Sequence, residues 1–279
     1  MSNATKTNLK LEILLSTMHR NSLDFLVKLF PDGSYQNYNL LIINQTTEDC
    51  LLESKFANIR VINSFTKGLA NSRNLALENA VGPYCLIADD DVVYNSNFED
   101  IITKSFTTNT EADVITFKMK DFEGKDFKNY TASKWHDVKS VQLINSVVIA
   151  FRLQNIKTKK IKYNRHFGLG GTFETADEYI FLRDCLKANL KLWFQSQYIL
   201  SHDFNSSGKA LGSNRIVFAK SALFYKYSGI FGYLRLFKYL IVIFNLNYFT
   251  RKEFFAKLKL GLQGVSAYKK LIREGQEIR

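Results

Sequence analysis

The chain has 279 residues, of which 46% are hydrophobic and only two are proline. This length fits one large domain or one domain with an appendage, and the composition excludes an intrinsically disordered chain. The net charge of +12 is uneven, because residues 205–279 contain 14 Lys/Arg and 3 Asp/Glu and so carry +11. The first 204 residues therefore carry about +1, and this asymmetry predicts a basic C-terminal segment with a role of its own.

Two features at the level of single residues indicate the compartment. Cys50, Cys85 and Cys185 are odd in number, far apart and without zinc-binding spacing, which favours free thiols in a reducing cytoplasm. Residues 1–8 are polar and lack the apolar segment of a signal peptide. We interpret them as a disordered N-terminus or vector-derived residues.

Short apolar runs alternate with helical patterns in the first 120 residues. The patterns predict strands at residues 9–19, 38–49, 58–64, 83–88 and 112–119, and helices at residues 21–30, 68–82 and 98–109. Further along, residues 175–190 predict a helix and residues 192–202 a strand. Strands that alternate with helices indicate βαβ units and a parallel sheet.

Polar residues follow several of these strands where each one ends. Ser16 and Thr17 follow the first strand, Asn44 and Gln45 the second, and residues 89–91 the fourth. Ligands of open α/β sheets bind outside the carboxyl ends of the strands. We therefore expect these side chains to form one site.

The fourth strand runs directly into three aspartates, Asp89, Asp90 and Asp91. A solvated turn, with one aspartate capping the next helix, is the plain alternative. Adjacent carboxylates become favourable when a divalent cation neutralises them. In an extended segment Asp89 and Asp91 project to one side and Asp90 to the other.

The run "GLANSRNLALENAVGPYCLIADDD" at residues 68–91 resembles the family 2 glycosyltransferases, inverting enzymes of the GT-A fold that use nucleotide sugars. The resemblance extends over about residues 9 to 205. It implies an α/β, Rossmann-like, mixed and mostly parallel sheet flanked by helices. The matching positions are Gly68, Arg73, Asn74, Ala80, Gly82, Asp89 and Asp91.

The resemblance also implies a domain organisation. Residues 9–208 are the expected catalytic domain, with a nucleotide-sugar half at 9–118 and an acceptor half at 119–208. Residues 209–279 are the expected helical extension, which is basic and rich in aromatic residues.

By resemblance, Asp91 ligates Mn²⁺ or Mg²⁺, and Asp89 faces the donor and shares the metal. Asp90, the middle residue of the motif, is also expected near the donor, with a less defined role. Arg73 either approaches the diphosphate or is a surface arginine. The family often has an acid after its second strand that reads uridine, whereas this chain has "NQTTED". Asn44 and Gln45 can still hydrogen-bond a base, and Ser16 and Thr17 complete the expected donor contacts.

The helix expected at 175–190 begins beside two acids, Asp177 and Glu178. Thr175 and Glu178 have the spacing of a capping box, which is the structural interpretation. In the functional interpretation Glu178 is the general base that takes the acceptor's proton, and Asp177 is its rival. A helix N-terminus favours the ionised carboxylate that a base requires.

His202 ends the last predicted strand. By resemblance it completes the metal site, and a purely structural histidine is the alternative. Ser206 and Ser207 follow it and are expected to hydrogen-bond phosphate. Trp135 and His136 are expected on the acceptor side or, for the tryptophan, in the core or at the surface.

The segment 221–262 is basic and aromatic, and Arg235 and Lys238 interrupt its longest apolar run. A membrane span needs about 20 predominantly apolar residues. We therefore expect an interfacial helix on an anionic membrane rather than a span. Packing on the catalytic domain or on a second subunit, as in a homodimer, is the alternative.

These observations lead to one functional hypothesis: a metal-dependent inverting glycosyltransferase, of hexosyltransferase type, that uses a UDP-linked sugar. Its acceptor is a saccharide or a lipid-linked hydroxyl, in bacterial surface polysaccharide or lipid-linked oligosaccharide synthesis. It is expected in the cytoplasm, peripherally on the inner face of the plasma membrane, without nucleic acid. A nucleotidyltransferase and a non-enzymatic basic module that binds nucleic acid or membrane are the alternatives.

Overall fold

The computed structural model describes residues 10–31, 33–130, 133–203 and 211–277. The chain divides into two compact units, which we name the sheet unit (residues 1–163 and 178–204) and the helical unit (residues 164–177 and 205–279).

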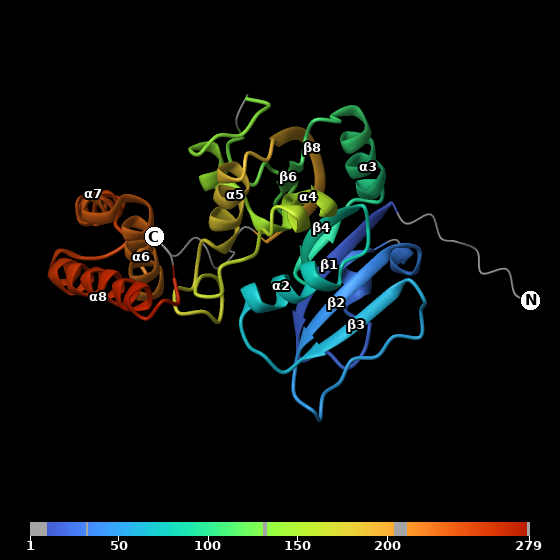
Figure 1. The fold of residues 1–279 in the computed structure, drawn as a ribbon, viewed down its shortest axis with the longest axis horizontal. Coiled ribbons are helices and arrows are strands. Elements are labelled where there is room, and N and C mark those ends of the chain that lie inside the picture. The colour runs from blue at the N-terminus through green and yellow to red at the C-terminus, as the bar shows by residue number, and fades with distance from the viewer. Residues whose placement is uncertain (1–9, 32, 131–132, 204–210, 278–279) are drawn as a thin grey trace, which may run out of the picture. The chain divides into compact units, whose positions relative to one another are not determined.

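Within the described residues, the sheet unit contains one mixed sheet of eight strands (Figure 1). In spatial order the strands are β3 (Ile59–Ser64), β2 (Asn39–Gln45), β1 (Leu11–Met18), β4 (Tyr84–Asp89), β7 (Ile149–Arg152), β6 (Val114–Lys120), β8 (Leu192–His202) and β5 (Val92–Tyr94). The pairs β3–β2, β2–β1, β1–β4 and β6–β8 are parallel, while β7 and β5 pair antiparallel with their neighbours. The predicted GT-A fold, a mixed and mostly parallel sheet with flanking helices, is confirmed.

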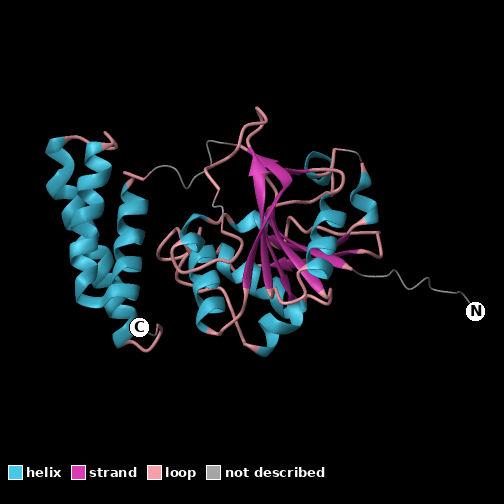
Figure 2. Cartoon of the chain, turned by 90° about the horizontal axis from the view of Figure 1, so that it is seen from above, coloured by secondary structure: helices cyan, strands magenta, loops and turns pink. Residues whose placement is uncertain are grey.

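Helices cover the sheet, as the ribbon in Figure 2 shows. Those of the sheet unit are α1 (Leu26–Leu29), α2 (Leu69–Asn79), α3 (Phe98–Thr108), α4 (Leu153–Thr158) and α5 (Asp177–Lys187), whose first residue lies at the unit boundary. The apolar faces of the strands and of α3 form one buried core, in which Ile102, Phe106 and Leu86 are fully enclosed. Burial of this apolar surface is the main stabilising contribution to the unit.

The first predicted helix is shorter than expected. The sequence predicts a helix over residues 21–30, but α1 spans Leu26–Leu29. Phe25, Leu26, Leu29 and Phe30 are buried, and a single helical turn suffices to bring them together. Pro31 follows, and the residue before a proline avoids the helical region; Phe30 accordingly has φ −126° and ψ 78°.

Two strands were not expected from the sequence. β5 (Val92–Tyr94) and β7 (Ile149–Arg152) are three and four residues long, too short to show a period of their own. Each exists because a longer strand lies beside it: β5 pairs with β8, and β7 lies between β4 and β6. β5 affects the geometry of the site, because it sets the direction of the chain directly after the aspartates.

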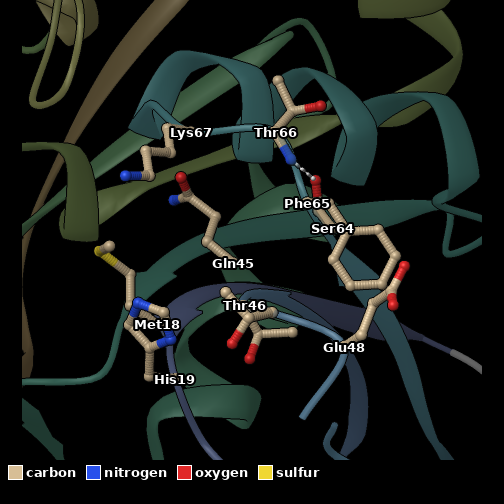
Figure 3. A pocket seen from close by; sticks show the side chains of 10 residues that line it. Met18, His19, Gln45, Thr46, Glu48, Ser64, Phe65, Thr66 and Lys67 are labelled. Atoms are coloured by element: carbon tan, nitrogen blue, oxygen red, sulfur yellow. Dashed lines mark hydrogen bonds between the residues drawn. The ribbon is translucent and has the colours of Figure 1, made fainter. Parts of the chain in front are cut away.

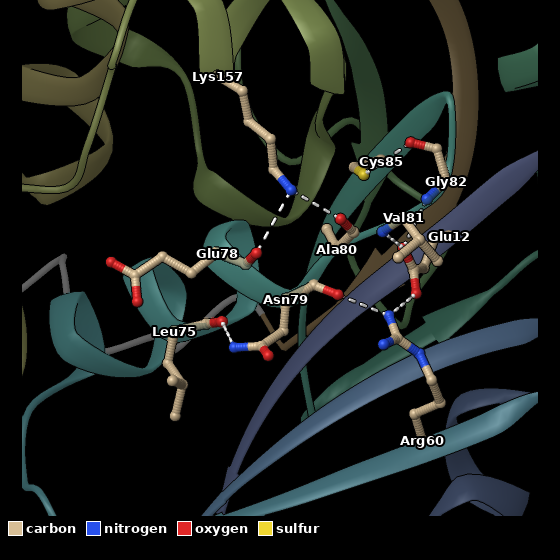
Figure 4. Close-up of polar contacts among 10 residues, drawn as sticks. All are labelled: Glu12, Arg60, Leu75, Glu78, Asn79, Ala80, Val81, Gly82, Cys85 and Lys157. Carbon is tan, nitrogen blue, oxygen red and sulfur yellow. Dashed lines mark hydrogen bonds and ion pairs between the residues drawn. The ribbon is translucent and has the colours of Figure 1, made fainter.

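A buried carboxylate fixes the loop between α2 and β4 (Figure 4). Glu12, only 2% exposed, accepts hydrogen bonds from the backbone nitrogens of Val81 and Gly82 at 2.7 and 2.8 Å. Arg60 donates to the same carboxylate at 2.6 Å and to the Asn79 carbonyl at 2.9 Å. A Cβ on Gly82 would lie 2.6 Å from Cβ of Glu12, so glycine is needed there for packing. This network positions β4, which ends in the three aspartates.

Within the described residues, the helical unit contains the helices α6 (Asn214–Ser228), α7 (Gly232–Asn245) and α8 (Phe254–Arg273), which pack side by side (Figure 2). Leu236, Leu240 and Ile243 of α7 face the other two helices. The expected helical C-terminal extension is confirmed. By length and composition, residues Asn214–Asn245 would suffice to cross a membrane. In the structure this stretch folds back at Gly229 (φ 53°), and Phe224 of α6 contacts Tyr239 of α7.

Candidate active site

The carboxyl edge of β1, β2 and β4 brings the predicted residues together. In the parallel registers, Ser16 pairs with Asp89, and Thr17 pairs with Asn44. The Ser16 hydroxyl is buried and has no hydrogen-bond partner among the described residues. A buried hydroxyl without a hydrogen-bond partner is typical of a site that receives a ligand.

The carboxylate of Asp89 forms an ion pair with a buried arginine. Nη2 of Arg73 is 3.0 Å from each carboxylate oxygen, and the Ser146 hydroxyl donates to Oδ2 at 3.4 Å. Arg73 is 1% exposed, and its guanidinium lies over the ring of Tyr163 at 5.4 Å from the centroid. The surface alternative for Arg73 is therefore wrong, and the side chain that it contacts directly at this edge is Asp89.

Asp90 points to the end of β1. It accepts a hydrogen bond from the Thr17 hydroxyl, and Arg20 donates to the same oxygen from Nη2 at 2.8 Å and from Nε at 3.2 Å. Arg20 is 40% exposed, so part of its guanidinium faces solvent. The charge of Asp90 is thus balanced by a residue that the sequence pattern did not indicate.

Asp91 faces His202. Val92 pairs with His202 across β5 and β8, and this pairing places Nε2 of His202 3.4 Å from Oδ1 of Asp91. The hydrogen bond from His202 holds the pKa of the Asp91 carboxyl below its usual value. Burial by itself lowers the pKa of His202, but its hydrogen bonds to Asp91 and to the Asp203 carbonyl raise it above the usual value.

The chemistry of this pair fits a divalent cation. Nδ1 of His202 lies 2.8 Å from the Asp203 carbonyl, which can only accept, so Nδ1 carries the proton. In a neutral imidazole Nε2 is then an acceptor, and it faces a second acceptor, the Asp91 carboxylate. Either a proton or a metal ion between them removes the repulsion. A single carboxylate from the protein is within the number that Mg²⁺ takes when water and substrate phosphates supply its other ligands.

Asp89 does not join that pair in the described structure. No group of three His, Cys, Asp or Glu side chains converges in the part of the chain that the structure describes. Both oxygens of Asp89 are next to Arg73 instead.

Asn44 occupies a structural position. It is completely buried, and its amide donates to the Arg20 carbonyl and to Oδ1 of Asn63, each at 2.9 Å. Its Oδ1 accepts from the Arg20 backbone nitrogen at 3.0 Å. Because both amide hydrogens are used, Asn44 orients residue 20 and so the arginine on Asp90, and it offers no donor to a nucleobase in this arrangement.

A pocket of about 470 Å³ lies beside this edge, between the segments that follow β1, β2 and β3. Gln45 lines it, and its Oε1 accepts a hydrogen bond from the Gly68 nitrogen at 2.7 Å, at the start of α2. Figure 3 shows Phe65 and Glu48 together on one side of the pocket and Met18 on another. The full lining is Met18, His19, Gln45, Thr46, Thr47, Glu48, Ser64, Phe65, Thr66 and Lys67.

Glu178 is half-buried on α5 and interacts electrostatically with Lys128. The Lys128 ammonium donates to the Leu143 carbonyl and to Oδ1 of Asn145 at 2.7 Å. Burial lowers the pKa of Lys128 to about 8, against the opposing effect of Glu178. Since Asn145 precedes Ser146, which contacts Asp89, these contacts link the predicted base to the aspartates within the sheet unit.

The two acids at the start of α5 lie in different surroundings. Asp177 is 4% exposed and packs against Gly168, where a Cβ would lie 2.8 Å from its Cγ. Ala176 has φ 69°, outside the helical region, so the helix starts at Asp177 and Thr175 is not its N-cap residue. The capping-box interpretation is therefore wrong.

The two residues expected on the acceptor side, His136 and Trp135, make ordinary packing and hydrogen-bond contacts. His136 is buried between the hydroxyls of Thr116 and Ser140, and burial lowers its pKa to about 4, so it is neutral. Trp135 is 42% exposed and packs edge-on against Trp193. Ser206 and Ser207 lie outside the described residues.

Sequence reasoning did not identify Arg20, Lys128 and Ser146. Arg20 directly follows a strand end that was already singled out, so its position was the available signal. Lys128 and Ser146 lie in loops without a pattern, and only the packing of residues 121–148 brings them to the site.

Known proteins resemble this chain both in sequence and in fold. The model of the family "Glycosyl transferase family 2" matches residues 19–180, and no curated protein matches the sequence. Residues 1–349 of S. aureus TarS superpose with a TM-score of 0.56 at 13% identity, over 97% of this chain and 93% of that one. TarS 1–349 in complex with UDP-GlcNAc gives a TM-score of 0.52, also at 13% identity and over the same shares of the two chains.

At this identity the likeness to TarS shows the fold alone, whereas the family model covers more than half of the chain. Together with the aspartates at the carboxyl edge of a GT-A sheet, that match establishes that the chain belongs to glycosyl transferase family 2.

Proposed function

We propose that this protein is a metal-dependent inverting hexosyltransferase that moves a sugar from a UDP-linked donor to a hydroxyl acceptor. The observation that carries the proposal is a set of three carboxylates beside a pocket at the carboxyl edge of the sheet. Each carboxylate pairs with a different basic side chain, either an arginine or His202. The TarS fragment similar in fold was crystallised with UDP and with UDP-GlcNAc, which supports a uridine nucleotide as the donor's carrier.

In this proposal the pocket holds the nucleoside. Phe65, 61% exposed, offers a face on which a base can stack, and Gln45 and Glu48 offer hydrogen-bonding groups. Lys67, also on the lining, meets the negative charge of the diphosphate. Glu48 stands four residues after Asn44, so an acid is present at the pocket although the expected one after the second strand is missing.

Asp91 and His202 would hold the divalent cation, and Asp89, fixed by Arg73, would face the donor's hydroxyl groups. When bound, Mn²⁺ or Mg²⁺ supplies positive charge that stabilises the departing diphosphate. Arg20 neutralises Asp90, so that its charge does not repel the donor's phosphates.

The acceptor is activated by Glu178 in this proposal. The carboxylate takes the hydroxyl proton while the acceptor oxygen forms a bond to the anomeric carbon, and the bond from that carbon to the diphosphate breaks on the opposite face. The positive charge of Lys128 interacts favourably with the Glu178 carboxylate. The acceptor class that we propose is a saccharide or lipid-linked hydroxyl of bacterial surface polysaccharide or lipid-linked oligosaccharide synthesis, in the cytoplasm.

A thermal-shift measurement with nucleotides tests the proposal. UDP with Mn²⁺ should raise the melting temperature, because a ligand at 100 times its Kd adds about 2.7 kcal/mol to the free energy of unfolding. ADP and GDP should raise it less. Asp91→Asn should lose the part of the shift that needs Mn²⁺, while the exposed control Glu111→Gln should keep it. If UDP with Mn²⁺ gives no shift in wild type, the proposed donor is wrong.

A further inference from the structure

The outward face of α7 is apolar although its inward face is already fully packed. Leu236, Leu240 and Ile243 fill the inward face, and Gly261 of α8 leaves room for Leu236, since a Cβ there would lie 2.6 Å from the leucine. Leu234, Phe237 and Ile241 are nevertheless 68%, 49% and 40% exposed. Rotation of the helix cannot bury both faces, so this second face is available to a partner.

The exposed apolar side chains continue onto α8. Phe237 contacts Phe254 at 6.0 Å between ring centroids, and Phe254 contacts Phe255, which is 78% exposed. We name Leu234, Phe237, Ile241 and Phe255 the outer face. Exposed apolar side chains in such a cluster mark an interaction site more often than scattered single ones do.

The charges around the outer face have one sign. Arg235 and Lys238 are exposed on α7, and Arg251 and Lys252 precede α8. Between residues 211 and 252 the chain contains no Asp or Glu. The nearest acid, Glu253, is engaged by Thr250 in a capping box. A partner that covers this face must therefore present negative charge around an apolar interior.

An anionic lipid surface has this chemistry. We propose that the outer face docks on an anionic membrane, with the apolar side chains in the boundary between headgroups and acyl chains and the basic side chains on lipid phosphates. Self-association through the same face would set Arg235 and Lys238 against their own copies, without an acid to compensate.

Co-sedimentation of the full chain with vesicles tests this proposal. Vesicles of phosphatidylcholine with phosphatidylglycerol should bind the protein at low salt and release it at 0.5 M NaCl, because salt screens exposed charges. Vesicles of phosphatidylcholine alone should bind it much more weakly. Arg235→Gln with Lys238→Gln should weaken binding about 30-fold, since each basic residue near an anionic surface contributes about fivefold.

A second set of variants tests the apolar side chains of the outer face. Leu234→Ser with Ile241→Ser should also lose binding, while the matched pair Val27→Ser with Val81→Ser, exposed in the sheet unit, should bind like wild type. Melting curves establish that each variant is folded. If an apolar variant is unstable, Phe255→Trp serves instead: brominated acyl chains should quench its emission more than that of wild type, whose tryptophans are both in the sheet unit.

Three results overturn the proposal. The first is no binding of the full chain to anionic vesicles at low salt, and the second is equal binding to neutral and anionic vesicles. The third is a change from dimer to monomer in analytical ultracentrifugation for Leu234→Ser with Ile241→Ser while vesicle binding stays unchanged. That result would assign the outer face to a second copy of the chain.

Discussion

Asp89, Asp90 and Asp91 are adjacent in the sequence, yet each carboxylate meets a different partner: Arg73, Arg20 and His202. The repulsion expected among them is reduced by this separation, because the chain turns between β4 and β5 and the side chains diverge. In the proposed function, the Asp91–His202 pair is the place for the divalent cation.

Glu178→Gln should lower kcat by a factor of about 10² to 10⁴, because a neutral amide cannot take the acceptor's proton. Donor affinity should change little, since Glu178 acts on the acceptor. Turnover and nucleotide binding measured on one preparation check this. Asp177→Asn is the matched variant, and a large loss of kcat there with normal turnover in Glu178→Gln would exchange the two roles.

Lys128→Met should change how stability depends on pH. Burial lowers the pKa of Lys128 to about 8 in the folded state, below the usual value of about 10.4 in the unfolded state. Between these values the unfolded chain binds more protons, so Lys128 makes the wild type more stable as the pH rises from about 8 to 10. The difference in melting temperature, wild type minus variant, should therefore increase over this range. A difference that stays constant with pH would contradict the buried ammonium.

At the scale of elements, the site depends on how β4 is held. Glu12 accepts two backbone hydrogen bonds from the loop before β4 and one from Arg60 (Figure 4). A carboxylate in that position replaces the partners that a regular strand or helix would give to those nitrogens. The sequence "EILL" gives no sign of this role, because an acid at the start of a strand is usually read as exposed.

Glu12→Ala should lower the free energy of unfolding by about 2 to 4 kcal/mol, because the buried nitrogen of Gly82 and the partly buried nitrogen of Val81 both lose their acceptor. Chemical denaturation checks the value. The control is Arg60→Gln, which should cost less than Glu12→Ala, because both backbone nitrogens still donate to the Glu12 carboxylate and Arg60 is 40% exposed. Equal losses for the two variants would mean that the ion pair, and not the backbone contacts, carries the stability.

At the scale of the whole molecule, each unit contains a buried apolar cluster of its own. One buried cluster includes Leu86, Phe106 and Ile115 of the sheet unit, and another includes Val217, Leu236 and Leu240 of the helical unit. Charge follows nearly the same division, because residues 205–279, the larger part of the helical unit, carry +11 of the total of +12. The proposed chemistry uses residues of the first unit, and the proposed membrane docking uses residues of the second.

Calorimetric unfolding of the full chain should therefore show two transitions, and UDP with Mn²⁺ should raise only that of the sheet unit. A ligand stabilises the cooperative unit to which it binds. Phe65→Ala, on the pocket wall, should abolish the shift without changing the other transition. A single transition that moves as a whole would show that the two cores unfold together.

The sequence alone determined the fold class, the parallel half of the sheet, the polar edge and the helical character of the C-terminal segment. These features follow from periodicity and from residues next to one another in the chain, as in the run from Gly68 to Asp91. The tertiary structure decided what each of those residues contacts: the burial of Arg73 under Asp89, the use of Asn44 as a support, the place of Lys128 beside Glu178 and the strands β5 and β7. Such contacts join residues up to 111 positions apart, as Asp91 and His202 are. No local pattern encodes them, because they arise only when the sheet closes and buried polar groups must find partners.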